Sequence, residues 1–187
     1  MDKLLNSGRA QLKTVADFIH SEITNAYKDV YAAATEDFEK DNIGEALFFW
    51  SFLKELKLKV HSKFFEDFQY HDGFQIVDQY GRLTYFSLNI AKLLKFDLDH
   101  VLNTPFDELF ERDPFMTKRI MESFVKIMSS PRDQVFDLAD IPQHVVKQIG
   151  FPNDSYTVCF KKAYPVYQHD GILYGYVLRL DVNPLDH

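Results

Sequence analysis

Apolar residues recur at helical spacing over two long stretches in the first third of the chain. From residue 4 to residue 38 there is no proline, and the apolar positions alternate steps of four and three residues, which is a heptad-like stripe. The stripe predicts an amphipathic helix that either lies on its own domain or pairs with a second subunit. Residues 43–68 predict a second helix, although residues 56–60 also alternate as a strand does. The residues of the first stripe that we expect at a dimer contact are Leu12, Ile19, Ile23 and Val30.

Beyond residue 72 the helical spacing gives way to short runs that favour β-strands. Residues 74–77 and 83–86 are two such runs, joined by a glycine-containing loop, and they predict a hairpin. Residues 156–167 and 172–181 predict a longer hairpin, because Asp-Gly between two apolar runs is a strong hairpin signal. Pro165 in this hairpin should lie at a bulge or where no backbone donor is needed.

Mainly helical segments separate the two hairpins. Helices are predicted at residues 88–94, 98–102, 105–110, 114–128 and 141–149, and a short strand at residues 134–138. Helices between hairpins cannot form a series of βαβ units, so the order predicts an α+β fold in which a five-stranded antiparallel sheet carries helices on one face. The last strand is apolar on both sides, so the other face must be covered by N-terminal helices or by a second subunit. We expect residues 1–72 to form a helical cap or dimerisation region with two helices, and residues 73–187 to form the sheet domain.

Composition narrows the classes of protein to consider. Of the 187 residues, 46% are hydrophobic and 26% are charged, as in ordinary globular domains. The formal net charge of -7 gives no overall attraction for nucleic acid or anionic lipid, so we expect contact with neither nucleic acid nor membrane. The single cysteine, Cys159, excludes an internal disulfide and a multi-cysteine metal site, and it suits core filling in a strand. No signal-peptide core is present in the first twenty residues, so we expect a cytoplasmic protein.

Three motifs follow one another in order from Phe74 onward: Asp78-Gln79-Tyr80-Gly81-Arg82-Leu83-Thr84-Tyr85, then Leu93-Leu94-Lys95-Phe96, then Phe106-Asp107-Glu108-Leu109-Phe110. A tyrosine-rich pair of strands across Asp170-Gly171 comes after them. In these motifs and their order, the region resembles the PAS domain family of sensory and interaction modules. The resemblance implies a sheet with helices curled over it, a cavity between them in which small ligands sit, and helical N-terminal caps that mediate dimers.

Aromatic residues are the leading candidates for the lining of such a cavity. They make up 16% of the chain, with 18 Phe and 10 Tyr. They can line a ligand pocket, with tyrosine hydroxyls orienting the ligand, or they can fill the same space as an ordinary core. With regular alternation, Tyr174 and Tyr176 share one face of the last strand. The candidate pocket residues are Tyr85, Phe106, Phe110, Met116, Ile120, Phe124, Val158, Phe160, Tyr174 and Tyr176.

The sequence offers little that could carry catalysis. It contains no nucleophile motif, phosphate-binding loop or metal-ligand spacing, so we expect no catalytic residue and no metal site, and we name no cofactor. His144 is a candidate axial haem ligand, although a surface or hydrogen-bonded histidine is the commoner interpretation. The acid pairs Glu111/Asp113 and Asp137/Asp140 fit solvated helix ends and loops.

We expect a non-enzymatic sensory or regulatory module that binds a small apolar ligand or a regulatory protein and signals as a homodimer through its N-terminal helices. The chain shows no output motif, which suits the sensor region of a transcription regulator. The alternative is a small α+β enzyme, of isomerase or dehydratase type, that acts on an apolar substrate. That enzyme would need a base and a donor in one pocket, for example an Asp beside Tyr174 or Tyr176.

Overall fold

The computed structural model describes residues 43–68, 72–94, 101, 104–106, 108–151 and 154–185. The helix predicted over residues 4–38, with its dimer stripe at Leu12, Ile19, Ile23 and Val30, lies outside the described residues, and so does most of the one predicted at 98–102. No helix in the described ranges is long and apolar enough to cross a membrane. In chain order the elements are α2 (Ile43–Glu55), β1 (Lys59–Val60), α3 (Lys63–Asp67), β2 (Gly73–Asp78), β3 (Leu83–Phe86), α4 (Leu88–Leu94), β4 (Phe110–Arg112), α6 (Pro114–Met128), β5 (Phe136–Asp137), β6 (His144–Gln148), β7 (Ser155–Tyr167) and β8 (Leu173–Pro184).

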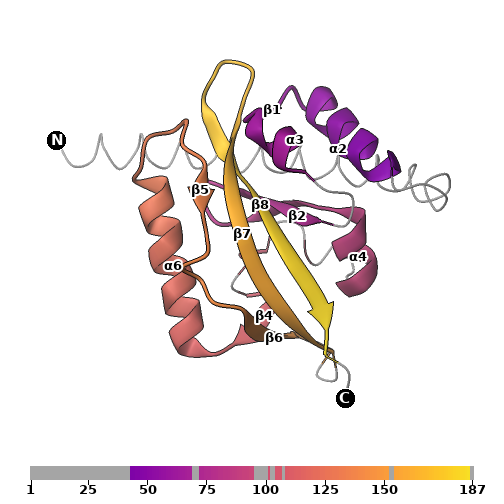
Figure 1. Cartoon of the computed structure of the whole chain (residues 1–187), viewed down its shortest axis with the longest axis vertical. Helices are drawn as coiled ribbons and strands as arrows, with labels where there is room; N and C mark the ends of the chain where they lie inside the picture. The colour runs from indigo at the N-terminus through magenta and orange to yellow at the C-terminus, as the bar shows by residue number, and fades with distance from the viewer. Residues whose placement is uncertain are drawn as a thin grey trace, which may run out of the picture.

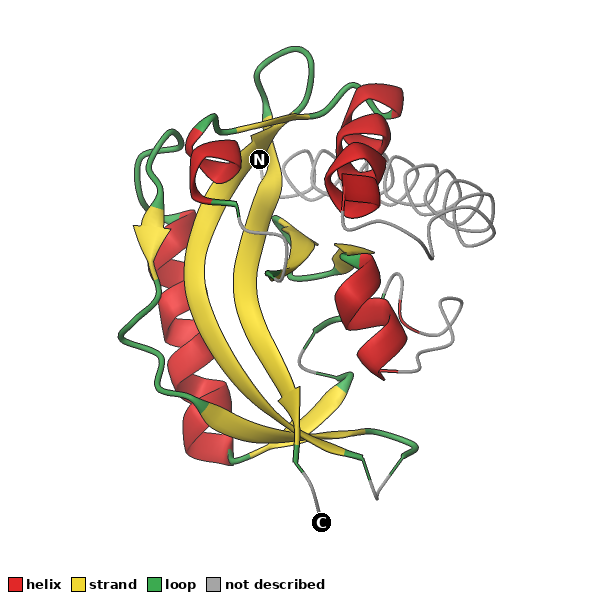
Figure 2. Cartoon of the chain, turned by 45° about the vertical axis from the view of Figure 1, so that its right-hand side comes forward, coloured by secondary structure: helices red, strands yellow, loops and turns green. Residues whose placement is uncertain are grey.

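The described strands form one antiparallel sheet (Figure 1). Six of them are hydrogen-bonded in the order β3-β2-β8-β7-β6-β4, and the short strands β1 and β5 both pair with β7. β7 and β8 are the longest strands and curve along the length of the molecule (Figure 2). The two predicted hairpins therefore share a single sheet, which confirms the α+β, PAS-like fold class. The sheet is larger than the five strands predicted, because β1, β4 and β6 also join it.

Helices cover both faces of this sheet. On one face, α4 and α6 pack on residues such as Leu83 and Phe160, and we call this set of buried residues the inner cluster. On the other face, α2 and α3 bury aromatic side chains against β2, β3 and β7, and we call this set the outer cluster. In the outer cluster the ring of Phe49 from α2 lies 4.7 Å from the ring of Phe74 at an interplanar angle of 63°. The face that sequence analysis left to N-terminal helices or a second subunit thus receives α2 and α3.

The single helix predicted over residues 43–68 is interrupted, because α2 ends at Glu55, β1 follows it, and the chain is helical again only in α3. At the end of α2 the backbone nitrogen of Leu58 donates to the carbonyl oxygen of Leu53 at 2.8 Å. Lys57 between them has a φ of 53°, the left-handed conformation that closes a helix end of this kind. Leu53 and Leu58 are both buried in the outer cluster, so burial stabilises the reversal. The chain then leaves as β1, where sequence analysis had noted a strand-like alternation.

Asp78 fixes the turn of the first hairpin. One carboxylate oxygen accepts from the backbone nitrogens of Tyr80 at 2.8 Å and Arg82 at 2.9 Å, and the other accepts from Nε of Arg82 at 2.8 Å. Gly81 has a φ of 79°, which favours glycine. Its carbonyl oxygen accepts from the backbone nitrogen of Phe106 at 3.1 Å and so ties the following loop to the turn. In the Asp-x-x-Gly part of the sequence motif, the Asp therefore accepts the hydrogen bonds that hold the turn, and the Gly adopts its left-handed conformation.

Residues 141–149 contain a strand, so the helix predicted there is wrong. β6 pairs with β7 on one side and β4 on the other. His144, Val146 and Gln148 are buried, and the residues between them are exposed, which is the period of two expected of a strand. The row of buried residues begins and ends with polar side chains, and this concealed the alternation in the sequence.

The other segments between the hairpins give a mixed result. α4 and α6 coincide with two predicted helices, and Asp113 caps α6. The helix predicted over residues 105–110 is wrong, because Pro105 forms an isolated β-bridge with Arg82 and Phe110 begins β4. The backbone nitrogen of Glu108 donates to the carbonyl oxygen of Pro105 at 3.0 Å, so the segment makes a single turn before β4 and not the predicted helix.

Pro165 occupies a position in β7 that needs no backbone donor, as predicted. It lies opposite Tyr176 of β8, and its carbonyl oxygen accepts from the backbone nitrogen of His61 at 3.0 Å, just past the end of β1. The nitrogen and oxygen of one strand residue point to the same side. The missing N–H of Pro165 therefore faces the β1 side and takes nothing from the ladder with β8.

Gly175 of β8 lies against β2 with no room for a side chain. A Cβ atom there would lie 2.2 Å from the carbonyl oxygen of Val77 and 2.7 Å from Cα of Asp78. We expect Gly175→Ala to lower the free energy of unfolding by about 3 kcal/mol, because backbone atoms have to move. Gly171→Ala is the control, since a Cβ there meets nothing within 4 Å and only its φ of 81° costs about 1–2 kcal/mol. Urea unfolding compares the two variants, and equal losses would contradict the close packing.

Asp67 links the end of α3 to β7. Its carboxylate accepts from Nζ of Lys162 at 2.6 Å and from the hydroxyl of Tyr164 at 2.9 Å. These hydrogen bonds hold the pKa of Asp67 below its ordinary value of 3.8. Because folding favours the charged carboxylate, its contribution to stability is complete above pH 3.8 and is lost as the pH falls through the lower pKa of the folded state.

We expect Asp67→Asn to lower the free energy of unfolding at pH 7 by about 1 kcal/mol, since the pair is partly exposed. Urea unfolding measured at decreasing pH should show the difference shrinking toward zero below pH 3.8. Glu122→Gln is the matched control, because Glu122 forms only an exposed pair with Lys118 at 3.9 Å and should change stability little. A difference that stays constant with pH would show that Asp67 does not act through its charge.

Candidate functional site

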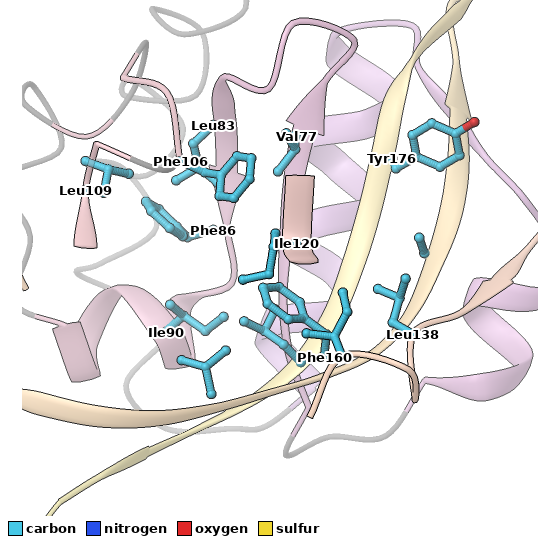
Figure 3. Packing of buried hydrophobic residues seen from close by; sticks show 14 of the residues in the cluster. Val77, Leu83, Phe86, Ile90, Phe106, Leu109, Ile120, Leu138, Phe160 and Tyr176 are labelled. Carbon is cyan, nitrogen blue, oxygen red and sulfur yellow. The ribbon is translucent and has the colours of Figure 1, made fainter. Parts of the chain in front are cut away.

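A small cavity lies on the inner face of the sheet, next to α4 and the loop that carries Phe106 and Leu109. Its volume is about 30 Å³. Figure 3 shows Leu83, Phe106, Leu109 and Ile90 on this side of the inner cluster, with Tyr176 further along the sheet. The cavity is lined by Gln75, Leu83, Ile90, Leu94, Phe106, Leu109, Phe110, Arg112, His144, Val146, Val158, Phe160, Leu180 and Val182.

The volume sets what the folded cavity can hold. One water molecule needs about 10–15 Å³ of such space, so a cavity of about 30 Å³ admits one or two. All but three of the lining residues are apolar, and their side chains fill most of the space between the sheet and α4. A larger ligand therefore has to displace part of the wall.

His144 supplies a polar atom to this apolar wall. The residue is 8% exposed, and its Nδ1 lies 3.0 Å from the carbonyl oxygen of Pro142. A carbonyl oxygen only accepts, so Nδ1 carries the proton and the neutral ring keeps a lone pair on Nε2. Among the described residues, none forms a hydrogen bond with Nε2. Burial lowers the pKa of His144 below its ordinary value of 6.5, which favours the neutral ring.

Arg112 brings a positive charge to the same wall. Its guanidinium group lies 5.7 Å from the ring centroid of Phe106 and 5.8 Å from that of Phe110, within the range of cation–π attraction. The pairing of β4 with β6 places Arg112 opposite Val146, two residues from His144. The charge of Arg112 adds to burial in lowering the pKa of His144, so the imidazole stays neutral at pH 7.

Gln148 continues the buried polar row of β6 beyond the cavity lining. It is 2% exposed, lies opposite Phe110 of β4, and shares its strand face with His144 and Val146. Neither the oxygen nor the nitrogen of its amide has a hydrogen-bond partner among the described residues. A buried polar group without a partner costs about 1–3 kcal/mol. We call His144 and Gln148 the polar pair of β6.

The structure brings together four of the ten pocket residues proposed from sequence. Those that line the cavity are Phe106, Phe110, Val158 and Phe160. Those that join or pack against the inner cluster without lining the cavity are Met116, Ile120, Phe124 and Tyr176. Tyr85 and Tyr174 lie in the outer cluster, on the opposite face of the sheet from the cavity.

A register shift separates Tyr174 from Tyr176. The pairing of β7 with β8 is irregular between Val166 and Tyr167, opposite Gly175. Alternation therefore changes phase at Gly175, so that Tyr174 points into the outer cluster and Tyr176 into the inner one. The expectation that both tyrosines share one face is wrong for this reason.

The polar part of the cavity was missed by sequence reasoning. Gln75 and Arg112 were not considered, and His144 was placed on a helix. A haem does not fit a cavity of about 30 Å³, so nothing here supports His144 as an axial ligand. Residues 144–148 could have pointed to this wall if read as a strand, although two of the three residues in its buried row are polar.

A second, more open groove of about 540 Å³ lies between residues 137–143 and the opposite side of β7 and β8. Its charged side chains are paired, Arg179 with Asp72 at 2.7 Å and Lys161 with Asp181 at 2.7 Å. Cys159 is half-buried in its wall. Among the described residues, no group of three or more His, Cys, Asp and Glu side chains is placed to hold a metal ion.

Two of the four acids singled out in the sequence, Asp113 and Asp137, hold backbone turns. Asp113 accepts from the backbone nitrogens of Phe115 at 2.9 Å and Met116 at 3.2 Å, which caps α6. Asp137 accepts from the backbone nitrogen of Ala139 at 2.8 Å. Neither lines the cavity, and the lining contains no carboxylate.

No protein-family model and no curated protein matches the chain. Among solved structures, a similar chain is the Cycle PAS-B domain of Drosophila melanogaster with bound ethylene glycol, which is 12% identical, with 59% of this chain and 99% of that chain covered and a TM-score of 0.44. The PAS domain of a protein from Colwellia psychrerythraea is 12% identical, with 64% and 91% covered and a TM-score of 0.42. The sensor region of a sensor histidine kinase is 14% identical, with 59% and 39% covered and a TM-score of 0.36. These overlaps are partial, and the strand order and register given above define the fold.

Acid should destabilise the fold through His144. Its pKa in the folded chain lies below 6.5, so as the pH falls below 6.5 the unfolded chain takes up a proton that the folded chain does not. We expect urea unfolding to show a loss of stability from pH 6.5 downward that His144→Leu removes. His169→Asn, on the exposed hairpin turn, is the control and should keep the loss. A pH profile that His144→Leu leaves unchanged would contradict a buried neutral imidazole.

Proposed function

We propose that the chain is a non-enzymatic sensory module that binds a small ligand in the inner-face cavity. The observation that carries the proposal is a polar atom in an apolar wall: His144 is more than nine-tenths buried, and its Nε2 has no partner among the described residues. Buried polar side chains in packed cores are almost always hydrogen-bonded.

Binding would change the shape of the domain. The folded cavity admits only one or two water molecules, so a larger ligand has to push back the wall made by α4 and the loop with Phe106 and Leu109. Opening the wall costs packing energy, which the ligand recovers through its own contacts and through a hydrogen bond to Nε2 of His144. A ligand that binds the opened state better than the closed one shifts the population toward it, which is what a sensor requires.

β2 offers a route from the cavity to the outer face. Gln75 lines the cavity, whereas its neighbours Phe74 and Ile76 pack in the outer cluster, since adjacent strand residues point to opposite faces. Phe74 contacts Phe49 of α2 with ring centroids 4.7 Å apart. A displacement of Gln75 would therefore move Phe74, the residue of β2 on which α2 packs.

The output we propose is a change in how the N-terminal region pairs. α2 begins at Ile43, directly after the segment that carries the predicted stripe of Leu12, Ile19, Ile23 and Val30. We propose that this stripe forms a homodimer contact whose geometry follows α2, or that it presents a surface to a regulatory protein. The setting that suits this device is the cytoplasmic sensor region of a transcription regulator.

Mass spectrometry of small molecules released from the natively purified chain tests the binding. We expect one compound to be released in an amount close to that of the protein. Val158→Leu adds a methylene group to the cavity wall and should reduce the released compound at least about tenfold, because the space it enters is about the size of one such group. Val145→Leu makes the same change on the exposed side of β6 and should release as much as the unmodified chain.

NMR of backbone amides tests the route. Restoring the compound to the stripped chain should shift signals of β6 and of α2, and Phe49→Leu should reduce the shifts in α2 while leaving those of β6. A chain that releases no small molecule, and whose spectrum does not change in a metabolite extract, would overturn the proposal of ligand sensing.

A further inference from the structure

We propose that the cavity selects an uncharged ligand with a compact apolar body and one hydroxyl group, an alcohol or a phenol whose O–H donates to Nε2 of His144. This inference rests on the proposed ligand-sensing function and names the chemical class of the ligand. Three features of the wall carry it: the acceptor on His144, the positive charge on Arg112, and the apolar side chains around them.

The hydrogen-bonding role of His144 is fixed by its neighbour. Nδ1 donates to the carbonyl oxygen of Pro142, so Nε2 offers a lone pair and no proton. A ligand atom that faces Nε2 must therefore bring a hydrogen. A hydroxyl brings one, whereas a carboxylate, an ether or a ketone would set lone pair against lone pair. The ring also lies 6.0 Å from that of Phe160 at an interplanar angle of 27°, and this stacking fixes the direction of the lone pair.

The charge of Arg112 excludes a cationic donor. An ammonium group could also donate to Nε2, but it would have to lose its hydration next to a guanidinium group on the neighbouring strand. The same charge contributes to the lowered pKa of His144. A neutral hydroxyl avoids both costs.

The remaining wall selects the body of the ligand. Eleven of the fourteen lining residues are apolar, and the rings of Phe106, Phe110 and Phe160 are among them. These apolar side chains favour every apolar group of the ligand that leaves water on binding. The favoured ligand therefore carries its hydroxyl at one end of an aliphatic or aromatic body.

Four small probes of nearly equal shape test the chemical class. They are benzyl alcohol, ethylbenzene, benzylammonium and benzoate. The first three carry a hydroxyl, a methyl and an ammonium group on the same benzyl group, and benzoate carries a carboxylate on the ring. Titration of the stripped native chain followed by amide NMR should show benzyl alcohol binding most tightly. Ethylbenzene should bind about tenfold more weakly, since it leaves Nε2 unpaired, and benzylammonium should show no saturable shifts. Benzoate should bind more weakly than benzyl alcohol, because its lone pairs would face that of Nε2.

Variants at one site separate the hydroxyl contact from simple apolar binding. In His144→Leu the preference for benzyl alcohol over ethylbenzene should disappear while ethylbenzene still binds, and Val145→Leu, on the exposed side of β6, should keep the preference. If His144→Leu does not fold, the order of the four probes on the unmodified chain still decides. Tightest binding by benzoate or benzylammonium, or equal binding of alcohol and hydrocarbon, would overturn the assigned class and leave ligand sensing standing.

Failure of the class and failure of the function give different results. If none of the four probes binds but the purified chain releases a compound, the assigned class is wrong and the compound identifies the true one. If the probes bind equally well to Val158→Leu, they bind outside the cavity, and both the class and the cavity proposal are wrong.

Discussion

β8 is paired with β7 along one edge over most of its length and with β2 along the other from Gly175 to Leu180, and the arrangement of the whole molecule follows from this double pairing. A strand held on both edges cannot rotate, so its side chains have to alternate between two faces that both need cover. α4 and α6 cover one face, and α2 and α3 cover the other. The pairing is tight enough at Gly175 that even a methyl group would meet the backbone of β2.

Because both faces of the sheet are covered, a change at the cavity on one face can reach the helices on the other. A wall of the cavity and the seat of α2 are built from adjacent residues of β2, so the two faces are separated by one strand and not by a layer of side chains. The polar pair of β6 adds a second feature, since both side chains are buried in an apolar cluster at an energetic cost. A ligand that forms hydrogen bonds with such buried groups would remove this energetic cost.

Particular residues show how far sequence reasoning reached. The two hairpins, α4 and α6 were predictable, because Asp-Gly turns, the Asp78 turn and the proline that opens α6 are local signals. The aromatic part of the cavity lining was also predicted from the sequence, since it consists of Phe106, Phe110 and Phe160. β6 and its histidine were not, since a five-residue strand with a polar, apolar, polar buried row has no distinctive period until its partners are known.

The sequence by itself determined the fold class, the hairpin turns and the absence of motifs for phosphate or multi-cysteine metal binding, because each depends on residues close together along the chain. Only the tertiary structure decided which face each tyrosine occupies, since a register shift opposite Gly175 reverses the alternation of β8. It also decided that His144, Arg112 and Gln75 meet at one cavity. These residues come from three different strands, and strand pairing over long separations is set by the packing of the whole sheet.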